Sequence, residues 1–342
     1  MKRIQHIAVA AAVLAAFCNP ATAQIRKVSN VAAPMSFARL AAPPIPTDNR
    51  LTPERVELGK MLFFDPRLSG SGWISCATCH NPALGWADAL PTARGENMKK
   101  LNRHTPTILN SAYNKRQMWD GRFASLEEQA LGPIGSPDEM NMDMRILLER
   151  LKAIEGYRAP FERAYPGEGI TDQTIAKAIA SYERTIVSGE APFDRWLKGD
   201  AKAIAVAAKR GFELFRGKAN CVACHQGANF TDDGFHNIGV KPLEGVDDPG
   251  RFAKVPVKIM KGAHKTPSLR DVAITAPYMH NGAYATLREV VEMYNRGGDD
   301  KSNLSPEMKK LELSDREIDD VVAFLKTLSG KPVQVTLPQL PY

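Results

Sequence analysis

Two cysteine pairs constrain this chain more than any other feature, because each pair is followed at once by a histidine. The first motif reads Cys76-Ala-Thr-Cys79-His80, and the second reads Cys221-Val-Ala-Cys224-His225. The spacing C-x-x-C-H is typical of covalent haem attachment, in which two thiols bond the haem vinyl groups and the adjoining histidine binds the iron. The sequence therefore predicts two haem c groups, with His80 and His225 as iron ligands.

The N-terminal residues have the pattern of a secretory signal peptide. Lys2 and Arg3 precede an apolar run over residues 7–17, and Ala21-Thr22-Ala23 is a cleavage site of small residues. We expect residues 1–23 to be removed and the protein to be exported to the periplasm. The apolar run is too short to span a bilayer, and no later stretch is apolar enough to do so.

A disulfide, a zinc knuckle and a thioredoxin-like dithiol are the alternatives for such cysteine pairs. The chain has five cysteines, and Cys18 lies in the predicted signal peptide. The other four all belong to the two motifs, and both motifs carry the histidine. Because the chain is also predicted to be exported, these observations favour haem.

The charge and its distribution along the chain bear on the kind of partner the protein binds. The formal net charge is +7, and removal of Lys2 and Arg3 leaves +5. An excess of this size is enough for solubility, and it also suits docking to an acidic redox protein. Basic residues do not form a stripe with interleaved aromatic residues, so we expect no nucleic-acid partner.

Periodicity indicates a mainly α protein with long loops. Residues 24–50 are rich in Pro and Ala and predict an N-terminal tether. We expect two cytochrome c-like haem domains, over 51–195 and 196–342, in which haem replaces part of the usual core. Patterns of alternating strands are scarce. The expected helices span about 53–62, 125–132, 141–154, 171–188, 201–216, 286–294 and 314–328.

The two halves repeat with a constant offset of 161 residues. Thr105-Pro106-Thr107 matches Thr266-Pro267-Ser268, and Gly121 matches Gly282. The haem motifs are 145 residues apart, so the connecting loops differ. Each half thus carries a haem motif and a downstream segment that could cover the other face of the haem.

The offset makes a prediction about the two irons. It pairs Trp119 with His280 and Pro133 with Tyr294. If Tyr294 is the sixth ligand of the second haem, its counterpart at the first is a proline, which has no side-chain donor atom. The first haem would then be open to substrate at this position. A slip of one residue in the downstream register is the alternative.

Further motifs run along both halves of the chain. They are Phe63 to Ser69, Cys76 to Asn81, Trp119 to Arg122, Leu126 to Gln129, Gly132 to Ile134, Pro137 to Met140, Phe235 to Gly239, Lys265 to Leu269 and Pro277 to Gly282. Together these segments resemble the bacterial dihaem cytochrome c peroxidase and MauG superfamily, over nearly all of the chain after the signal peptide. The resemblance implies that the N-terminal haem reacts with hydrogen peroxide and that the C-terminal haem relays electrons.

The resemblance also implies roles for four residues of the first half. Trp119 would lie between the haems and transfer electrons. Gln129, Pro133 and Glu139 would line the peroxide pocket. A carboxylate such as Glu139 can move a proton between the two peroxide oxygens as a general acid and base. The alternatives are a solvated loop carboxylate for Glu139 and a helix-surface amide for Gln129.

Two positions decide the subgroup. Peroxidases of the family typically carry a distal histidine after a glycine in the loop behind the first haem motif, but here Gly95 is followed by Glu96. The missing histidine predicts a five-coordinate iron, unless His104 reaches it. At the second haem the peroxidases use Met and MauG uses Tyr. Met293 and Tyr294 stand side by side, and only one of them can bind the iron. Counting from His280 and the internal repeat both favour Tyr294.

A calcium ion between the domains is a further feature of the family. Thr275 and Pro277 match the positions of its carbonyl ligands. The usual Asn is His104 here, a poor calcium ligand, which argues against this ion. We expect His236, His264 and His280 to bind haem propionates or the domain interface, and not iron.

Three functions remain open. The first is a MauG-like enzyme that uses hydrogen peroxide to oxidise a protein partner; for MauG the partner is the precursor of methylamine dehydrogenase, whose tryptophans become tryptophan tryptophylquinone. The second is a cytochrome c peroxidase that reduces peroxide with electrons from a small cytochrome or cupredoxin. The third is an electron-transfer cytochrome without catalysis, which the pocket of Gln129, Pro133 and Glu139 argues against.

Overall fold

The computed structural model describes residues 37–39 and 42–342. The predicted signal peptide lies outside these residues, as does most of the tether. The described residues form one compact unit. No helix in the described residues is long and apolar enough to cross a membrane.

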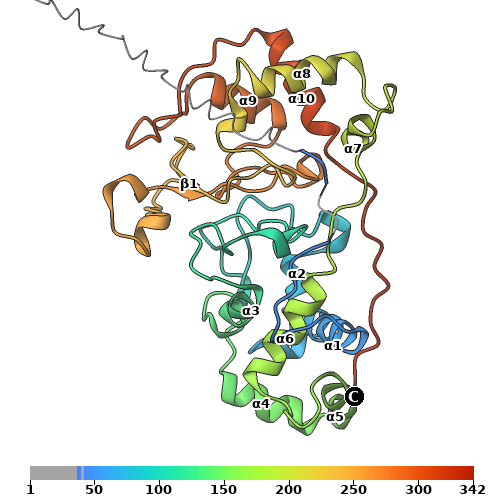
Figure 1. The fold of residues 1–342 in the computed structure, drawn as a ribbon. Coiled ribbons are helices and arrows are strands. Elements are labelled where there is room, and N and C mark those ends of the chain that lie inside the picture. The colour runs from blue at the N-terminus through green and yellow to red at the C-terminus, as the bar shows by residue number, and fades with distance from the viewer. Residues whose placement is uncertain (1–36, 40–41) are drawn as a thin grey trace, which may run out of the picture. The chain divides into compact units, whose positions relative to one another are not determined.

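The described chain is mainly helical, as predicted (Figure 1). Its only strands in this part are β1 (Phe235–His236) and β2 (His264–Lys265), which pair antiparallel. Over residues 37–39 and 42–342, ten α-helices are joined by long loops and short 3-10 turns. They are α1 (Pro53–Phe64), α2 (Cys76–Cys79), α3 (Leu126–Gly135), α4 (Met144–Ala153), α5 (Glu155–Ala164), α6 (Asp172–Glu183), α7 (Pro192–Leu197), α8 (Val206–Arg216), α9 (Leu287–Asn295) and α10 (Asp315–Lys326).

Most expected helices are present, with corrected ends. The helix expected at 171–188 stops at Glu183, just before the β-branched Thr185, Ile186 and Val187. The one expected at 201–216 begins only at Val206. Three helices, α2, α5 and α7, are not among those expected. Pro160 inside α5 gives that segment the composition of a helix break.

Each half is built on a pair of helices that cross at a glycine. Helix α1 packs against α6, and α8 packs against α10. A Cβ atom at Gly59 of α1 would lie 1.8 Å from the carbonyl oxygen of Ala178, and one at Gly211 of α8 would lie 1.8 Å from that of Asp320. Only glycine allows the backbones to approach so closely. The same crossing in both halves supports an internal repeat.

The repeat also holds in the loops and in the helices that follow them. Met118 and Met279, 161 residues apart, both have positive φ, at 72° and 75°, and Gly121 and Gly282 both have φ of 64°. Helix α3 begins after the N-cap Ser125, and α9 begins after Thr286, at the same offset. Since both helices then continue to residues 135 and 295, Pro133 and Tyr294 occupy equivalent helical positions.

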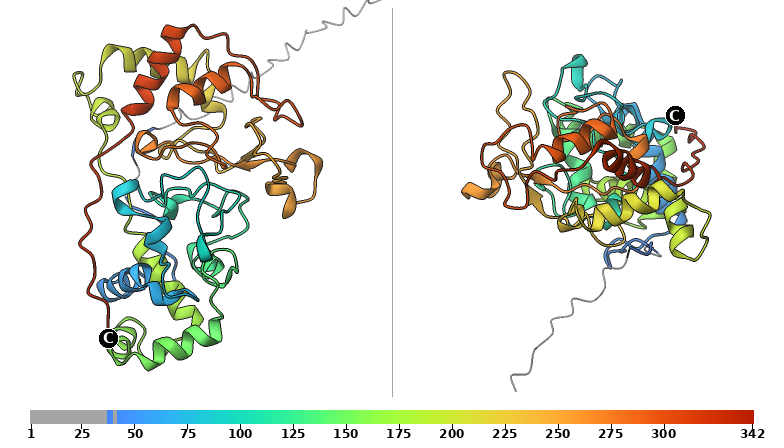
Figure 2. Two further views of the ribbon diagram at one scale, coloured as in Figure 1. Left: turned by 180° about the vertical axis from the view of Figure 1, so that it is seen from behind. Right: turned by 90° about the horizontal axis from the view of Figure 1, so that it is seen from above.

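Two hydrophobic cores lie around the two helix pairs. The first extends along the chain from Leu58 to Ile186 and the second from Phe193 to Leu328. Each core also receives a residue from outside its own range. Phe37 of the predicted tether is buried in the second core, and Val333 near the C-terminus packs against the first. The C-terminal segment runs back to α5, as both side views show (Figures 1 and 2). The domain boundary at residue 195 stays a prediction.

Candidate haem centres

The first cysteine motif forms a helical turn that presents its histidine to a cavity. Cys76 and Cys79 begin and end α2, and His80 caps it. The His80 Nδ1–H donates to the Trp86 carbonyl oxygen at 3.2 Å. A backbone acceptor on Nδ1 fixes the ring and leaves Nε2 free for a metal. His80 therefore has the orientation of an axial ligand.

The second motif repeats this arrangement. Cys221–Ala223 is a 3-10 turn, and the His225 Nδ1–H donates to the Phe230 carbonyl oxygen at 2.9 Å. Burial lowers the pKa of both His80 and His225. Both rings are therefore held neutral, in the form that binds a metal.

Three of the four motif cysteines have surroundings that fit thioether attachment better than thiolate chemistry. All four are free of disulfides. Burial raises the pKa of the Cys79 and Cys221 thiols to about 12, and that of Cys76 further still. Thiols with such pKa values supply little thiolate for zinc or for disulfide exchange. A thioether carries no ionisable group, so burial does not hinder its formation by disfavouring a charged state.

Each motif opens into a cavity large enough for a cofactor. The first cavity, of about 600 Å³, is lined by Cys76, Cys79 and His80. The second, of about 440 Å³, is lined by Cys221, Cys224 and His225. Cofactor sites commonly have volumes of about 300–1,000 Å³. The residues present thus fit one covalently bound haem in each cavity.

The residues expected at the peroxide pocket all line the first cavity. Gln129 and Pro133 reach it from α3, and Glu139 from the loop that follows. The Gln129 Nε2 lies 3.8 Å from the Met118 Sδ, a weak contact that leaves the amide available. Burial raises the pKa of Glu139. The cavity therefore holds an amide that can form hydrogen bonds and a carboxyl group that can transfer a proton.

His104 also lines the first cavity. The ring is buried, and its Nδ1–H donates to the Leu90 carbonyl oxygen at 2.7 Å. Thr275 and Pro277, the positions expected to bind calcium, line the same cavity. The calcium site stays a prediction.

In the second cavity the two candidate axial ligands are separated. Among the described residues, Tyr294 lines the second cavity and Met293 does not. Met293 is instead fully buried, with none of its surface exposed. Burial raises the pKa of the Tyr294 hydroxyl. The position of the side chains thus favours Tyr294 as the residue that faces the second haem.

Trp119 lines both cavities. Its Nε1–H donates to the His104 carbonyl oxygen at 2.9 Å, and its ring lies edge-on to that of His280, with 6.5 Å between centroids. His280 in turn stacks on His264 at 3.6 Å. The third expected histidine, His236, hydrogen-bonds Asp232 at 2.8 Å, and this contact raises its pKa to about 10.

Sequence reasoning missed several groups at these cavities. Glu183 is a buried carboxyl that lines the first cavity, and its Oε2 has no hydrogen-bond partner. Burial raises its pKa to about 8. Arg103 and Asp248 form an ion pair across the shared wall. Neither feature has a local sequence signature, because each depends on contacts between distant segments.

Comparison with known proteins agrees with this geometry. Residues 53–202 match the family model for di-haem cytochrome c peroxidase, and residues 208–329 match that for cytochrome c. The methylamine utilization protein MauG of Methylorubrum extorquens is 52% identical over 94% of this chain and 91% of its own. The cytochrome c551 peroxidase of Nitrosomonas europaea is 39% identical, over 87% of each chain.

A solved structure of a related protein supports the same family assignment. The crystal structure of a MauG-like protein associated with microbial copper homeostasis superposes with a TM-score of 0.79 and 31% identity, over 85% of this chain and 94% of that one. The relatives are haem-dependent oxidoreductases, which supports two haem c groups here. The chain belongs to the di-haem cytochrome c peroxidase and MauG family.

Proposed function

We propose that this protein is a periplasmic MauG-type enzyme that uses hydrogen peroxide to oxidise a protein partner. The observation that carries the proposal is the position of Tyr294, which lines the second cavity together with the motif of His225, while Met293 is buried elsewhere. The identity of 52% to a MauG protein supports it. In the finer form of the proposal, the partner is a precursor of methylamine dehydrogenase whose tryptophans mature to the quinone cofactor.

The bound haems supply the redox chemistry, and the residues of the chain control access and protons. Pro133 occupies the position equivalent to Tyr294 and offers no donor atom, so this position leaves the first cavity open to a small oxidant. Gln129 orients peroxide through its amide. The Glu139 carboxylate accepts a proton from one peroxide oxygen and returns it to the other. Trp119, which lines both cavities, couples them.

Replacement of each candidate ligand tests the central observation. In the holoprotein, Tyr294→Phe should change the absorption spectrum of the second haem, because it removes the oxygen that would bind iron. Met293→Leu keeps the volume and apolar character of the side chain, so it should leave the spectrum unchanged. The opposite pattern would reject Tyr294 as the ligand.

A cytochrome c peroxidase is the second candidate, because peroxidases of the family are 39% identical over most of the chain. Turnover distinguishes the two functions. With hydrogen peroxide as oxidant, the MauG-type enzyme should oxidise a precursor of methylamine dehydrogenase and should consume reduced small cytochrome or cupredoxin slowly. Rapid peroxide reduction with such a cytochrome, and no reaction with the precursor, would favour the peroxidase.

A further inference from the structure

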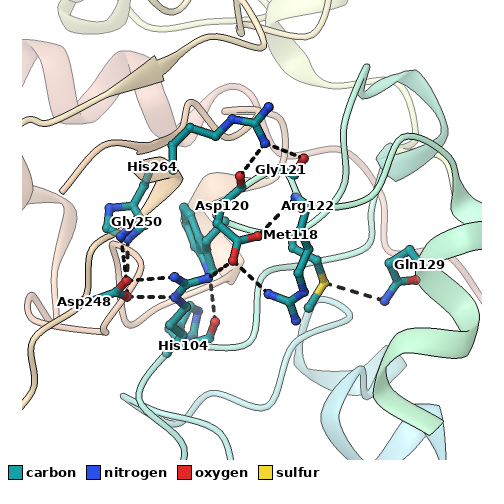
Figure 3. Close-up of polar contacts among 12 residues, drawn as sticks. His104, Met118, Asp120, Gly121, Arg122, Gln129, Asp248, Gly250 and His264 are labelled. Carbon is teal, nitrogen blue, oxygen red and sulfur yellow. Dashed lines mark hydrogen bonds and ion pairs between the residues drawn. The ribbon is translucent and has the colours of Figure 1, made fainter. Parts of the chain in front are cut away.

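Asp248 gathers four hydrogen bonds at the wall that the two cavities share. Arg103 donates to it twice, from Nε to Oδ2 at 2.8 Å and from Nη2 to Oδ1 at 2.7 Å. The Gly250 N–H donates to Oδ1 at 2.9 Å, and the His264 Nε2–H approaches Oδ2 at 3.4 Å (Figure 3). The side chain is only 13% exposed. These donors lower the pKa of Asp248, which is therefore ionised.

Both side-chain partners of Asp248 are chain neighbours of residues that hold Trp119. Arg103 precedes His104, whose carbonyl oxygen accepts the indole Nε1–H of Trp119 at 2.9 Å. His264 precedes Lys265, whose N–H donates to the Trp119 carbonyl oxygen at 2.8 Å. The carboxylate thus joins the two segments that fix the indole and the backbone of Trp119.

Two further contacts extend this arrangement to the ring face and to the next residue. His264 stacks on His280, the ring that lies edge-on to Trp119. Arg103 also donates from Nη1 to the Asp120 carboxylate at 2.9 Å. Arg103 and His264, the side-chain partners of Asp248, therefore each contact a residue that neighbours Trp119, either in sequence or in space.

From this arrangement we infer that Asp248 is a positioning residue for Trp119, which it holds between the two haem cavities. The carboxylate is suited to this task because it accepts from donors of both halves of the chain, Arg103 from the first and His264 from the second. The inference rests on the proposed role of Trp119 in electron transfer between the haems. It does not depend on which protein the enzyme oxidises.

Asp248→Asn is the informative substitution. An amide of the same size places an N–H donor group where a guanidinium, an imidazole and a backbone amide already donate, so the cluster must open. Asp320→Asn is the matched control. Asp320 accepts from the Arg210 Nε and Nη2 at 2.7 and 2.6 Å and is 7% exposed, but it joins α8 to α10 and lines neither cavity.

The experiment measures electron equilibration between the haems without peroxide or partner. One electron is injected by a laser flash into the fully oxidised holoprotein, and the two haem spectra are followed. Electron transfer weakens steeply as donor and acceptor move apart, so a displacement of Trp119 by about 1 Å should lower the rate about threefold or more. We expect this loss in Asp248→Asn with unchanged haem potentials, and a change below about twofold in Asp320→Asn.

Two outcomes would overturn the inference. One is a wild-type rate in Asp248→Asn, and the other is an equal loss in Asp320→Asn. If Asp248→Asn does not incorporate both haems, Arg103→Gln tests the same cluster from the other side of the ion pair, and a wild-type rate there also refutes it. A failure to oxidise any protein partner would refute the proposed function and leave the equilibration rates unaffected.

Discussion

Glu139→Gln should slow the reaction with hydrogen peroxide by about 10²–10⁴-fold, the usual contribution of a positioned general acid and base. Glu139 lines the first cavity from the loop after α3, and the substitution keeps its size while removing its proton affinity. The rate is measured by rapid mixing of the ferric holoprotein with peroxide, followed by haem absorption.

The pH dependence of the reaction rate gives a second test of the role of Glu139. Burial raises the folded pKa of Glu139 above its ordinary value of 4.5. A general base acts when it is ionised, so the wild-type rate should rise as the pH passes upward through this raised pKa. The Gln variant should show no such step.

The neighbouring carboxylate is the control. Asp138 also lines the first cavity, but its side chain is 54% exposed and pairs with Lys99. Asp138→Asn should change the rate less than about threefold, since an exposed ion pair contributes little. Equal losses in Asp138→Asn and Glu139→Gln, or a wild-type rate in Glu139→Gln, would refute the assignment of Glu139 to proton transfer.

Two further predictions concern stability. A Cβ atom at Gly121, where φ is +64°, would lie 2.2 Å from the Phe235 Cζ, so Gly121→Ala should lower the free energy of unfolding by about 1–3 kcal/mol for the clash, in addition to the backbone strain, measured by urea denaturation. Gly167→Ala, with φ of +75° and nothing within 4 Å, should cost only the backbone strain of about 1 kcal/mol, and equal losses would contradict the packing argument. Burial raises the folded pKa of Glu183 from 4.5 to about 8, so wild-type stability should fall as the pH rises between these values, and Glu183→Gln should be the more stable protein at pH 9 but not at pH 5. Parallel stability curves for the two proteins would show that the carboxyl is not buried as described.

The parts of the fold that follow from local patterns could be predicted from the sequence. The motifs of His80 and His225 depend on spacing alone, and the offset of 161 residues is enough to pair Pro133 with Tyr294. Helix α5 could not be predicted in this way. Pro160 is normally a helix breaker, and here tertiary packing of the buried Phe161 outweighs that preference.

The missing parts of the site depend on contacts between residues far apart in the chain. Arg103 and Asp248 are 145 residues apart, and only the folded loops bring them together. Glu183 lies at the end of a helix whose composition does not reveal which side meets the cavity. Neither position has a motif, whereas the haem ligands do, because covalent attachment demands a fixed spacing.

The most direct test of the central claim is to add one equivalent of hydrogen peroxide to the fully ferric holoprotein. A MauG-type enzyme has a first haem that is open without prior reduction, so an immediate change in the spectra of both haems is predicted. No reaction until one haem is reduced would contradict the account. It would indicate that a residue such as His104 closes the ferric site, as in a reductively activated peroxidase.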